Sequence, residues 1–263
     1  YRSSRGLGDV YKRQTQGRYD FMSGLHPAYM ETLLDEAGTL RPSFKNTLKH
    51  LHIPFLKTDY LGVVLDGVDT PEALRDARVR RAMSLALDRH GLARHLRRNA
   101  VTPTDHFVPP TMLARDAVHP VTQDVAQAQA LLTEAGYPKG QGVGEIVLST
   151  TSDYVDMCAA FQHDWAQLGL DVKVDVVPAS VHRERVAQGE TAMFYKSWLA
   201  DHADAENFLG LFVEANFSPG GPNYTHYRNP EFERGFQGAL LQADQPEARL
   251  EAYRALDAFI HED

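Results

Sequence analysis

The sequence has little of several features that identify common protein classes. Cys158 is the only cysteine among 263 residues, which excludes an internal disulfide framework and a cysteine-rich zinc site. No apolar run approaches the length needed to cross a bilayer, and no secretory signal is visible at Tyr1. The formal net charge of −8 argues against a nucleic-acid partner held by a basic face. Composition alone therefore indicates a globular protein and names no function.

Common enzyme signatures are missing too. The twelve histidines are scattered without an H-E-x-x-H spacing, and there is no G-x-S-x-G elbow and no phosphate-binding loop. The glycine-rich residues 140–144 lack the lysine and Ser/Thr of such a loop, so we interpret them as a turn. Asp201 and Asp204 leave a metal-dependent hydrolase open as an alternative, although nothing places a nucleophile or a metal beside them. We expect no enzyme, no metal and no cofactor.

The first residues do not have the pattern of a folded segment. Residues 9–14 resemble the translation of an adapter used in sequencing libraries, and the residues before them are polar and broken by glycine. We interpret residues 1–14 as a cloning or sequencing scar, with a natural disordered tail as the alternative. Such a scar would place the first residue inside a gene, so a missing signal segment carries no information about location.

Alternating strands and helices predict an α/β fold. Short apolar or alternating segments separate amphipathic segments of helical period, an order typical of a parallel or mixed sheet covered by helices. We expect strands at residues 60–65, 145–151, 172–176 and 193–198. We expect helices at residues 27–36, 76–87, 124–135, 154–168, 180–188, 230–243 and 246–260, with a further short helix after residue 88.

Aspartates mark several of the expected helix starts. Asp76 and Asp88 each precede a helix, where a short acceptor satisfies the free amides of the first turn. Asp124 with Gln127 resembles a capping box, and Gly136 is the expected stop of that helix. The apolar stripe of the helix after Asp76 consists of Val79, Ala82, Met83, Ala86 and Leu87. The arginines of that helix, Arg78, Arg80 and Arg81, point elsewhere, and we interpret them as a solvated face rather than an anion site.

Several segments, in order and spacing, resemble one family. Residues 76–110 contain D-x-R-V-R-x-A, then D-R and P-P; residues 124–138 contain D-x-x-x-A-x-x-L-L-x-x-A-G-Y-P; residues 168–172 resemble L-G-I-x-V. Asn223-Tyr224 and residues 229–232 resemble late motifs of the same proteins. Together these segments resemble the extracytoplasmic solute-binding proteins of ABC importers for peptides, oligopeptides and nickel. The resemblance covers about residues 17–263.

That resemblance implies a two-lobed α/β fold like that of class II periplasmic binding proteins, which closes over its ligand by hinge motion. Residues 15–64 are then a remnant of lobe one that ends in the hinge strand, and residues 65–263 are a C-terminally truncated lobe two. The expected hinge residues are Tyr60, Leu61, Val63 and Leu65.

The same resemblance implies a ligand site after the strand that ends near Trp198. In peptide-binding relatives, the aspartate that matches Asp201 pairs with the α-amino group of the ligand. Backbone groups at positions matching Ser197 and Leu199 bond to the peptide main chain as an added strand does. Asp204 is the second candidate for the amine. Alternatively, either aspartate caps the following helix or is a solvated loop acid.

Two further residues are candidates to line the cleft, and two positions depart from the family pattern. Asn223 and Tyr224 follow a loop rich in glycine and proline. His202 and Ala205 stand where relatives commonly have tyrosine and proline, which leaves the ligand preference open.

The resemblance implies capture of short peptides and their delivery to ABC permease subunits in the membrane. We expect a monomer at the periplasmic or extracellular face of the cytoplasmic membrane, without nucleic acid and without a cofactor. A sensory or scaffold module on the same fold is the alternative. Peptide length, lipid anchoring and the possibility of nickel or another solute stay open.

Overall fold

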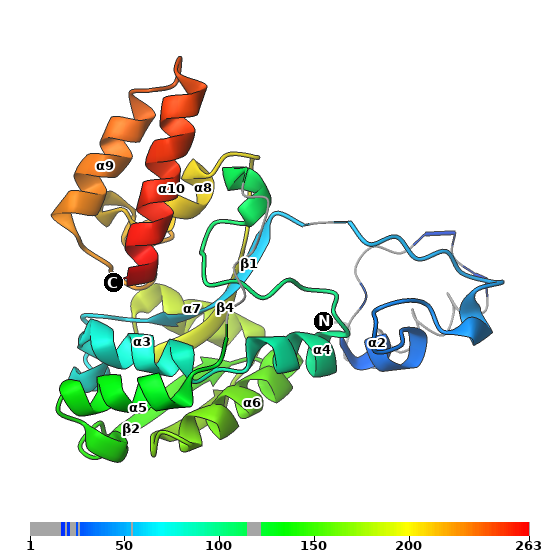
Figure 1. Cartoon of the computed structure of the whole chain (residues 1–263), viewed down its shortest axis with the longest axis horizontal. Helices are drawn as coiled ribbons and strands as arrows, with labels where there is room; N and C mark the ends of the chain where they lie inside the picture. Colours follow the sequence, from blue (N-terminus) through cyan, green and yellow to red (C-terminus); the bar gives the residue numbers. More distant parts are fainter. Residues whose placement is uncertain are drawn as a thin grey trace. The chain divides into compact units, whose positions relative to one another are not determined.

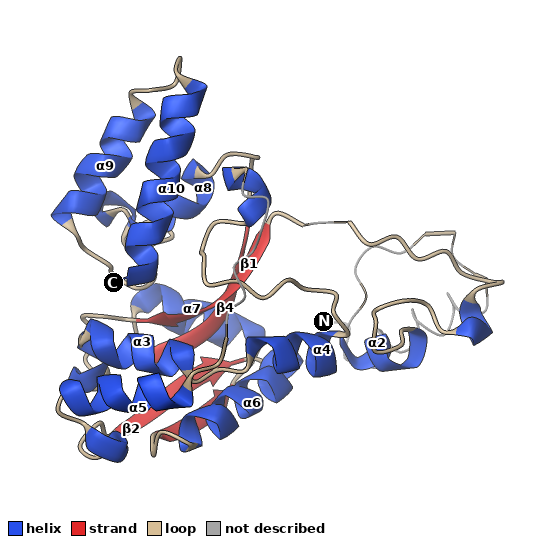
Figure 2. Ribbon diagram, viewed as in Figure 1, coloured by secondary structure: helices blue, strands red, loops and turns tan. Residues whose placement is uncertain are grey.

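In the computed structural model, which describes residues 17–18, 20–21, 25, 27–53, 55–114 and 122–262, the strands form one mixed sheet (Figure 1). Its order is β1-β4-β2-β3. β1 (Lys57–Val63) runs antiparallel to β4 (Met193–Leu199), whereas β2 (Glu145–Thr150) runs parallel to both β4 and β3 (Asp171–Val176) (Figure 2). The expected α/β class is confirmed. Residues 1–14, interpreted as a scar, lie outside the described residues.

The described helices largely follow the expected ranges. They are α2 (Pro27–Leu33), α3 (Ala77–Leu85), α4 (Arg89–Arg97), α5 (Val125–Glu134), α6 (Val155–Ala166), α7 (Ala179–Gln188), α8 (Glu206–Leu209), α9 (Pro230–Leu240) and α10 (Pro246–Glu262). The helix expected at 27–36 ends earlier, because Leu34 leaves it to pair with Leu40 around a turn closed by the Asp35 carboxylate. The first strand was expected at 60–65 but lies at 57–63, so Leu65 falls outside it.

Two helical layers cover opposite faces of the sheet. Phe194 and Tyr195 are neighbours in β4, so their side chains point to opposite faces. Phe194 packs with Val186 of α7. The Tyr195 ring centroid lies 5.9 Å from that of Phe161 in α6. α7 therefore covers one face and α6 the other, and the indole N–H of Trp165 in α6 donates to a carbonyl of α3 at 2.8 Å.

The helix caps expected at Asp76 and Asp124 are confirmed. The Asp76 carboxylate accepts from the amide of Arg78 at 2.9 Å, and that of Asp124 accepts from the amide of Gln127 at 2.8 Å. α4 begins at Arg89, directly after Asp88, although a bond from the Asp88 carboxylate stays a prediction. The expected apolar stripe is confirmed as well, because Val79, Ala82, Met83, Ala86 and Leu87 are all buried.

The expected solvated arginine face is only partly right. Arg78 is exposed, but it pairs with Asp76 at 2.6 Å. Arg80 donates to two backbone carbonyl oxygens of the preceding turn. Arg81 donates to Nε2 of His261 at 2.8 Å. Arg78 also donates to the Glu134 carbonyl of α5 at 2.8 Å, so each guanidinium bonds outside α3, which helical periodicity cannot reveal.

A second core lies beyond the sheet, where the β1–β4 ribbon extends toward α8, α9 and α10 (Figure 1). It combines aliphatic with aromatic side chains, and Phe212, Tyr227 and Phe232 pack edge to face, an arrangement that aromatic rings prefer. Its buried aromatic members are Phe208, Tyr227, Phe232, Phe236 and Tyr253. Trp198, at the end of β4, packs against this core.

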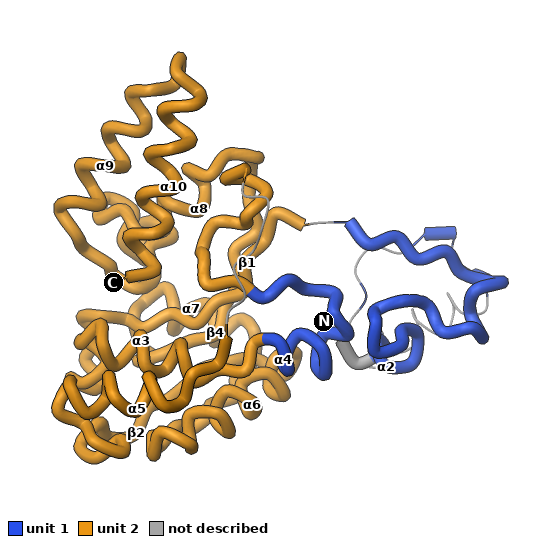
Figure 3. Tube along the Cα trace, in the orientation of Figure 1, with its two compact units in different colours: residues 1–54, 90–103 blue, residues 55–89, 104–263 orange. Residues whose placement is uncertain are grey.

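The chain divides into two compact units, residues 1–54 with 90–103 and residues 55–89 with 104–263 (Figure 3). The sheet and both helical layers belong to the second unit. This division differs from the expected boundary after residue 64, because β1 pairs with β4 along its whole length. The assignment of these parts to two lobes stays a prediction.

The first unit contains α2 and the turn that follows it. Ion pairs of Glu31 with Arg98 at 3.0 Å and of Glu36 with Arg94 at 3.1 Å join α2 and its turn to residues 90–103. Several large apolar side chains of this unit are exposed: Phe21, Leu51 and Ile53.

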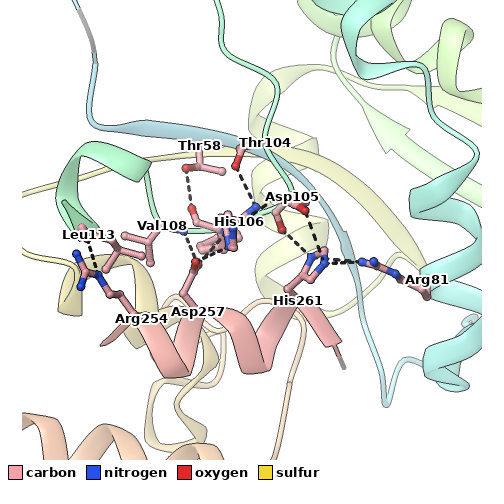
Figure 4. A network of polar contacts seen from close by, with 11 residues as sticks. Thr58, Arg81, Thr104, Asp105, His106, Val108, Leu113, Arg254, Asp257 and His261 are labelled. Atoms are coloured by element: carbon pink, nitrogen blue, oxygen red, sulfur yellow. Dashed lines mark hydrogen bonds and ion pairs between the residues drawn. The ribbon is translucent and has the colours of Figure 1, made fainter. Parts of the chain in front are cut away.

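Within the second unit, α10 is fastened to the loop before residue 110 by a buried carboxylate (Figure 4). Asp257 has no exposed surface. Its Oδ1 accepts from the amides of Phe107 at 3.0 Å and Val108 at 2.9 Å, and its Oδ2 lies 2.8 Å from Nδ1 of His106. Three donors around one buried carboxylate replace the water that it loses.

We predict that Asp257→Ala destabilises the protein by about 3 kcal/mol, because it leaves the buried donors without an acceptor. Urea unfolding measures the change in the free energy of unfolding. The control is Glu251→Ala on the same helix, which removes an exposed pair with Arg254 and should cost about 0.5 kcal/mol. Equal losses in the two variants would contradict this account.

Candidate functional site

The register of β1 and β4 determines which backbone groups of β4 are free. The Val64 amide donates to the Ala192 carbonyl at 3.0 Å, and the Ala200 amide donates to the Leu56 carbonyl at 2.9 Å. In an antiparallel ladder the residues bonded to the partner strand alternate with residues that face away. Residues 194, 196 and 198 therefore bond to β1. Residues 195, 197 and 199 direct their amides and carbonyls to the other edge.

Most of that other edge is open. β2 pairs with β4 only at Met193 and Phe194, and no described strand lies beyond them on this side. The carbonyl of Tyr195 accepts from His182 at 3.1 Å. Ser197 and Leu199 follow, and Leu199 is half exposed. The two residues expected to pair with a ligand main chain are thus the two whose backbone groups face the open edge.

The residue that holds the Trp198 side chain, Asn207, was not among those expected from the sequence. The Trp198 indole N–H donates to the side-chain oxygen of Asn207 at 2.8 Å. The same oxygen accepts from the amide of Asp201 at 3.3 Å. Asn207 lies in α8, just past the exposed loop, and the only available signal was a polar residue directly before the apolar pair Phe208 and Leu209.

The two candidate aspartates differ in their surroundings. Oδ1 of Asp204 accepts from the Glu206 amide at 2.9 Å, and Oδ2 lies 3.1 Å from Arg249. Both oxygens of Asp204 are therefore engaged, one by the amide of Glu206 and one by Arg249. Asp201 is exposed, and among the described residues nothing bonds to its carboxylate. Of the two, Asp201 is the one whose charge is available to a ligand.

Asn223 has a different place from the one expected. It is fully buried, and its amide group donates to the carbonyls of Val213 at 3.1 Å and Tyr227 at 3.0 Å. Its side-chain oxygen accepts from Thr225 and from the Tyr227 amide, each at 3.2 Å. These bonds occupy the whole side chain, so Asn223 organises its own loop and does not face solvent, which corrects the expectation that it lines a cleft.

Tyr224 lies against β4, on the face that carries Phe194. The ammonium of Lys196 lies 4.4 Å from the centre of the Tyr224 ring, within the range of a cation–π contact. Burial lowers the pKa of Lys196 and raises the pKa of Tyr224. Tyr224 thus lies near the strand of the candidate site, and its contact with a ligand stays a prediction.

The expected hinge residues belong to β1 or to the turn after it. Tyr60, Leu61 and Val63 lie within the strand, and the amide of Leu65 donates to the Thr225 carbonyl at 2.9 Å. Burial raises the pKa of the Tyr60 hydroxyl far above its ordinary range. Their role as a hinge stays a prediction.

His182 holds the edge of β4 just before the open part begins. Nε2 faces the Tyr195 carbonyl, which only accepts, so Nε2 carries the hydrogen and Nδ1 accepts from the hydroxyl of Ser149 at 3.0 Å. Burial is the main cause that lowers the pKa of His182 below its ordinary value of 6.5. The bond to Tyr195 opposes this shift, and the charges of Lys196 and Arg183 add to it.

The described residues bear on the alternative of a metal-dependent hydrolase. They contain no group of three or more His, Cys, Asp or Glu side chains that could hold a metal ion. His226 lies between Asp66 at 2.7 Å and the Ser218 hydroxyl at 3.1 Å, but Ser218 is buried and its own carbonyl is equally close to the ring. We interpret this contact as a link between loops. None of the described helices is both long enough and apolar enough to cross a membrane.

A family model and curated proteins match much of the chain. The model describes the bacterial extracellular solute-binding proteins, family 5 Middle, and matches residues 10–219. The dipeptide-binding protein of Escherichia coli K12 is 26% identical over 231 residues, 86% of this chain and 42% of that protein. The oligopeptide-binding protein OppA of Bacillus subtilis 168 is 28% identical over 199 residues, 72% of this chain and 36% of that protein. The chain thus spans less than half the length of these relatives.

Solved structures share the fold over nearly the whole chain. The periplasmic binding protein DppA from Helicobacter pylori, in complex with the peptide STSA, has a TM-score of 0.79 at 22% identity and covers 97% of this chain, 47% of its own. The dipeptide-binding protein from Pseudoalteromonas sp. SM9913, in complex with Met-Leu, has a TM-score of 0.77 at 21% identity, covering 98% of this chain and 49% of its own.

We predict that the stability of the fold depends on pH through His182. The unfolded chain takes up a proton near pH 6.5, whereas folded His182 stays neutral to lower pH. Its contribution is therefore complete above that pH and is lost as the pH falls below it. Between about pH 7.5 and about pH 5.5, urea unfolding should show a larger loss for the wild type than for His182→Gln.

The matched control is His163→Gln, since His163 is an exposed residue of α6. This variant should keep the wild-type dependence on pH. The same dependence in wild type and His182→Gln would contradict the role given to His182.

Proposed function

The chain belongs to the bacterial extracellular solute-binding proteins of family 5, and we propose that it captures short peptides by adding them as a strand to β4. The observation that carries this proposal is the open edge at Ser197 and Leu199 beside the Asp201 carboxylate, to which no group in the described part of the chain bonds. A ligand that offers amides and carbonyls in alternation matches such an edge, and a peptide main chain is a ligand of that kind. Relatives named for dipeptide and oligopeptide binding support the same class.

The charge at Asp201 gives the bound peptide a direction. An ammonium that enters a cleft loses water, and a charge-assisted bond to a carboxylate compensates for the loss. Asp201 follows the end of β4, so the peptide amino terminus lies at that end and the rest of the peptide extends back along Leu199 and Ser197. The indole of Trp198 provides a flat apolar wall whose orientation is already fixed by Asn207.

Recognition through the main chain suits a transport receptor. Backbone pairing contributes affinity whatever the side chains are, so one site accepts peptides of many sequences. We further propose that the protein works as a monomer at the outer face of the cytoplasmic membrane, and that its partners are ABC permease subunits. No bond of the ligand is made or broken in this function.

We predict that Asp201→Asn weakens binding of trialanine by roughly tenfold to a hundredfold, because an amide cannot form the charge-assisted bond. Isothermal titration calorimetry measures the change in affinity, with the full-length protein encoded by the gene that contains this sequence. For the same reason, N-acetyl-trialanine, which has no ammonium, should bind the wild type as weakly as trialanine binds the variant.

The matched control is Asp244→Asn, an exposed aspartate just after α9, which should leave the affinity unchanged. Equal affinity of the wild type and Asp201→Asn for trialanine would rule out Asp201 as the amine site. No binding of any di- to tetra-alanine by the wild type would rule out peptide capture itself.

A further inference from the structure

Three donors or acceptors of the candidate ligand segment converge on the side chain of Asn207. Its oxygen accepts from the Trp198 indole at 2.8 Å and from the Asp201 amide at 3.3 Å. Its nitrogen lies 3.4 Å from Nδ1 of His202. Both Trp198 and Asp201 donate, so the oxygen of Asn207 must face them, and the orientation of the amide group is determined by its partners.

We propose that Asn207 is a positioning residue of the ligand site, which holds the Trp198 indole and the Asp201 backbone in the geometry that receives a free peptide amino terminus. The inference rests on the proposed function, in which Asp201 takes the ammonium. A single acceptor with two lone pairs fixes the wall and the charge relative to each other. This role assigns Asn207 a share in selectivity for the amine.

The anchor itself is rigid. Asn207 is followed in α8 by Phe208, whose side chain is fully buried in the second core. Arg249 of α10 holds the start of α8, with Nη1 at 3.1 Å from Asp204 and Nη2 at 3.0 Å from Glu206. The packing of α8 against the second core therefore determines where Asn207 lies, and the bond from Asp201 to Asn207 fixes the loop at that place.

The loop has little else to hold it at Asp201. Asp201, His202 and Ala203 are exposed, and the last ladder bond of β4 is the one from the Ala200 amide to the Leu56 carbonyl. In the described part of the chain, the Asp201 backbone makes one hydrogen bond, from its amide to the side-chain oxygen of Asn207. Without it the carboxylate has to be ordered when the ligand binds, and this ordering lowers affinity.

This arrangement predicts a specific pattern of losses. Removal of the Asn207 acceptor should weaken binding of trialanine by about tenfold. It should weaken binding of N-acetyl-trialanine less, because that peptide contacts Trp198, Ser197 and Leu199 but does not use the Asp201 carboxylate. The ratio of the two affinities therefore falls, which a general loss of folded protein does not produce.

Two substitutions at one position separate positioning from packing. Asn207→Leu keeps the size of the side chain and removes the acceptor, whereas Asn207→Asp keeps an oxygen toward Trp198 and Asp201. We expect Asn207→Leu to lose the amine selectivity and Asn207→Asp to retain most of it. Calorimetry with trialanine and N-acetyl-trialanine measures both.

A readout without ligand makes the inference independent of peptide binding. In an NMR spectrum, the indole N–H signals of Trp198 and Trp165 are assigned with Trp198→Phe and Trp165→Phe. Asn207→Leu should shift the Trp198 signal and speed the exchange of the Asp201 amide, and Asn207→Asp should restore both. The Trp165 indole, bonded to the Met83 carbonyl at 2.8 Å, is the internal control and should not move.

The outcomes distinguish the two proposals. If the wild type binds no peptide, the proposed function fails, and the NMR comparison alone decides whether Asn207 positions Trp198 and Asp201. Unchanged Trp198 and Asp201 signals in Asn207→Leu overturn the inference. So does an equal loss of affinity for trialanine and N-acetyl-trialanine, or the absence of any rescue by Asn207→Asp.

Discussion

The antiparallel pairing of β1 with β4 is the constraint on which the other features depend. Its register determines which residues of β4 bond to β1 and which face the open edge. Within the paired strand, Phe194 and Tyr195 alternate to opposite faces, where α7 and α6 cover them. Because the ribbon continues past the rest of the sheet, it brings Trp198 to the aromatic core of the helical cluster. The sheet, the second core and the candidate site thus share one ladder of hydrogen bonds.

Local signals in the sequence were sufficient for much of this fold. The caps at Asp76 and Asp124 involve partners within three residues, so they can be recognised without the tertiary structure. Ser197, Leu199 and Asp201 of the candidate site followed from a family resemblance, and the geometry is compatible with all three. The start of β1 was missed because Lys57 and Asp59 are charged, and only pairing with β4 explains why they form a strand.

Contacts between distant residues account for what the sequence could not show. The engagement of Asp204 depends on Arg249 in α10, and the buried position of Asn223 depends on carbonyls of Val213 and Tyr227. Asn207 lies close to Trp198 in sequence, but only the turn between β4 and α8 brings the two side chains together. Polar residues of identical type therefore have different roles, and the partner that distinguishes them is set by tertiary packing.

The open edge of β4 has a consequence for how such a site can change. Its hydrogen-bonding groups belong to the backbone, so almost any residue at positions 197 and 199 preserves them, and proline is the exception because it lacks an amide hydrogen. Mutation can therefore alter the residues that surround the edge without erasing the edge. Related proteins can therefore diverge widely in sequence around this edge while they keep its backbone donors and acceptors.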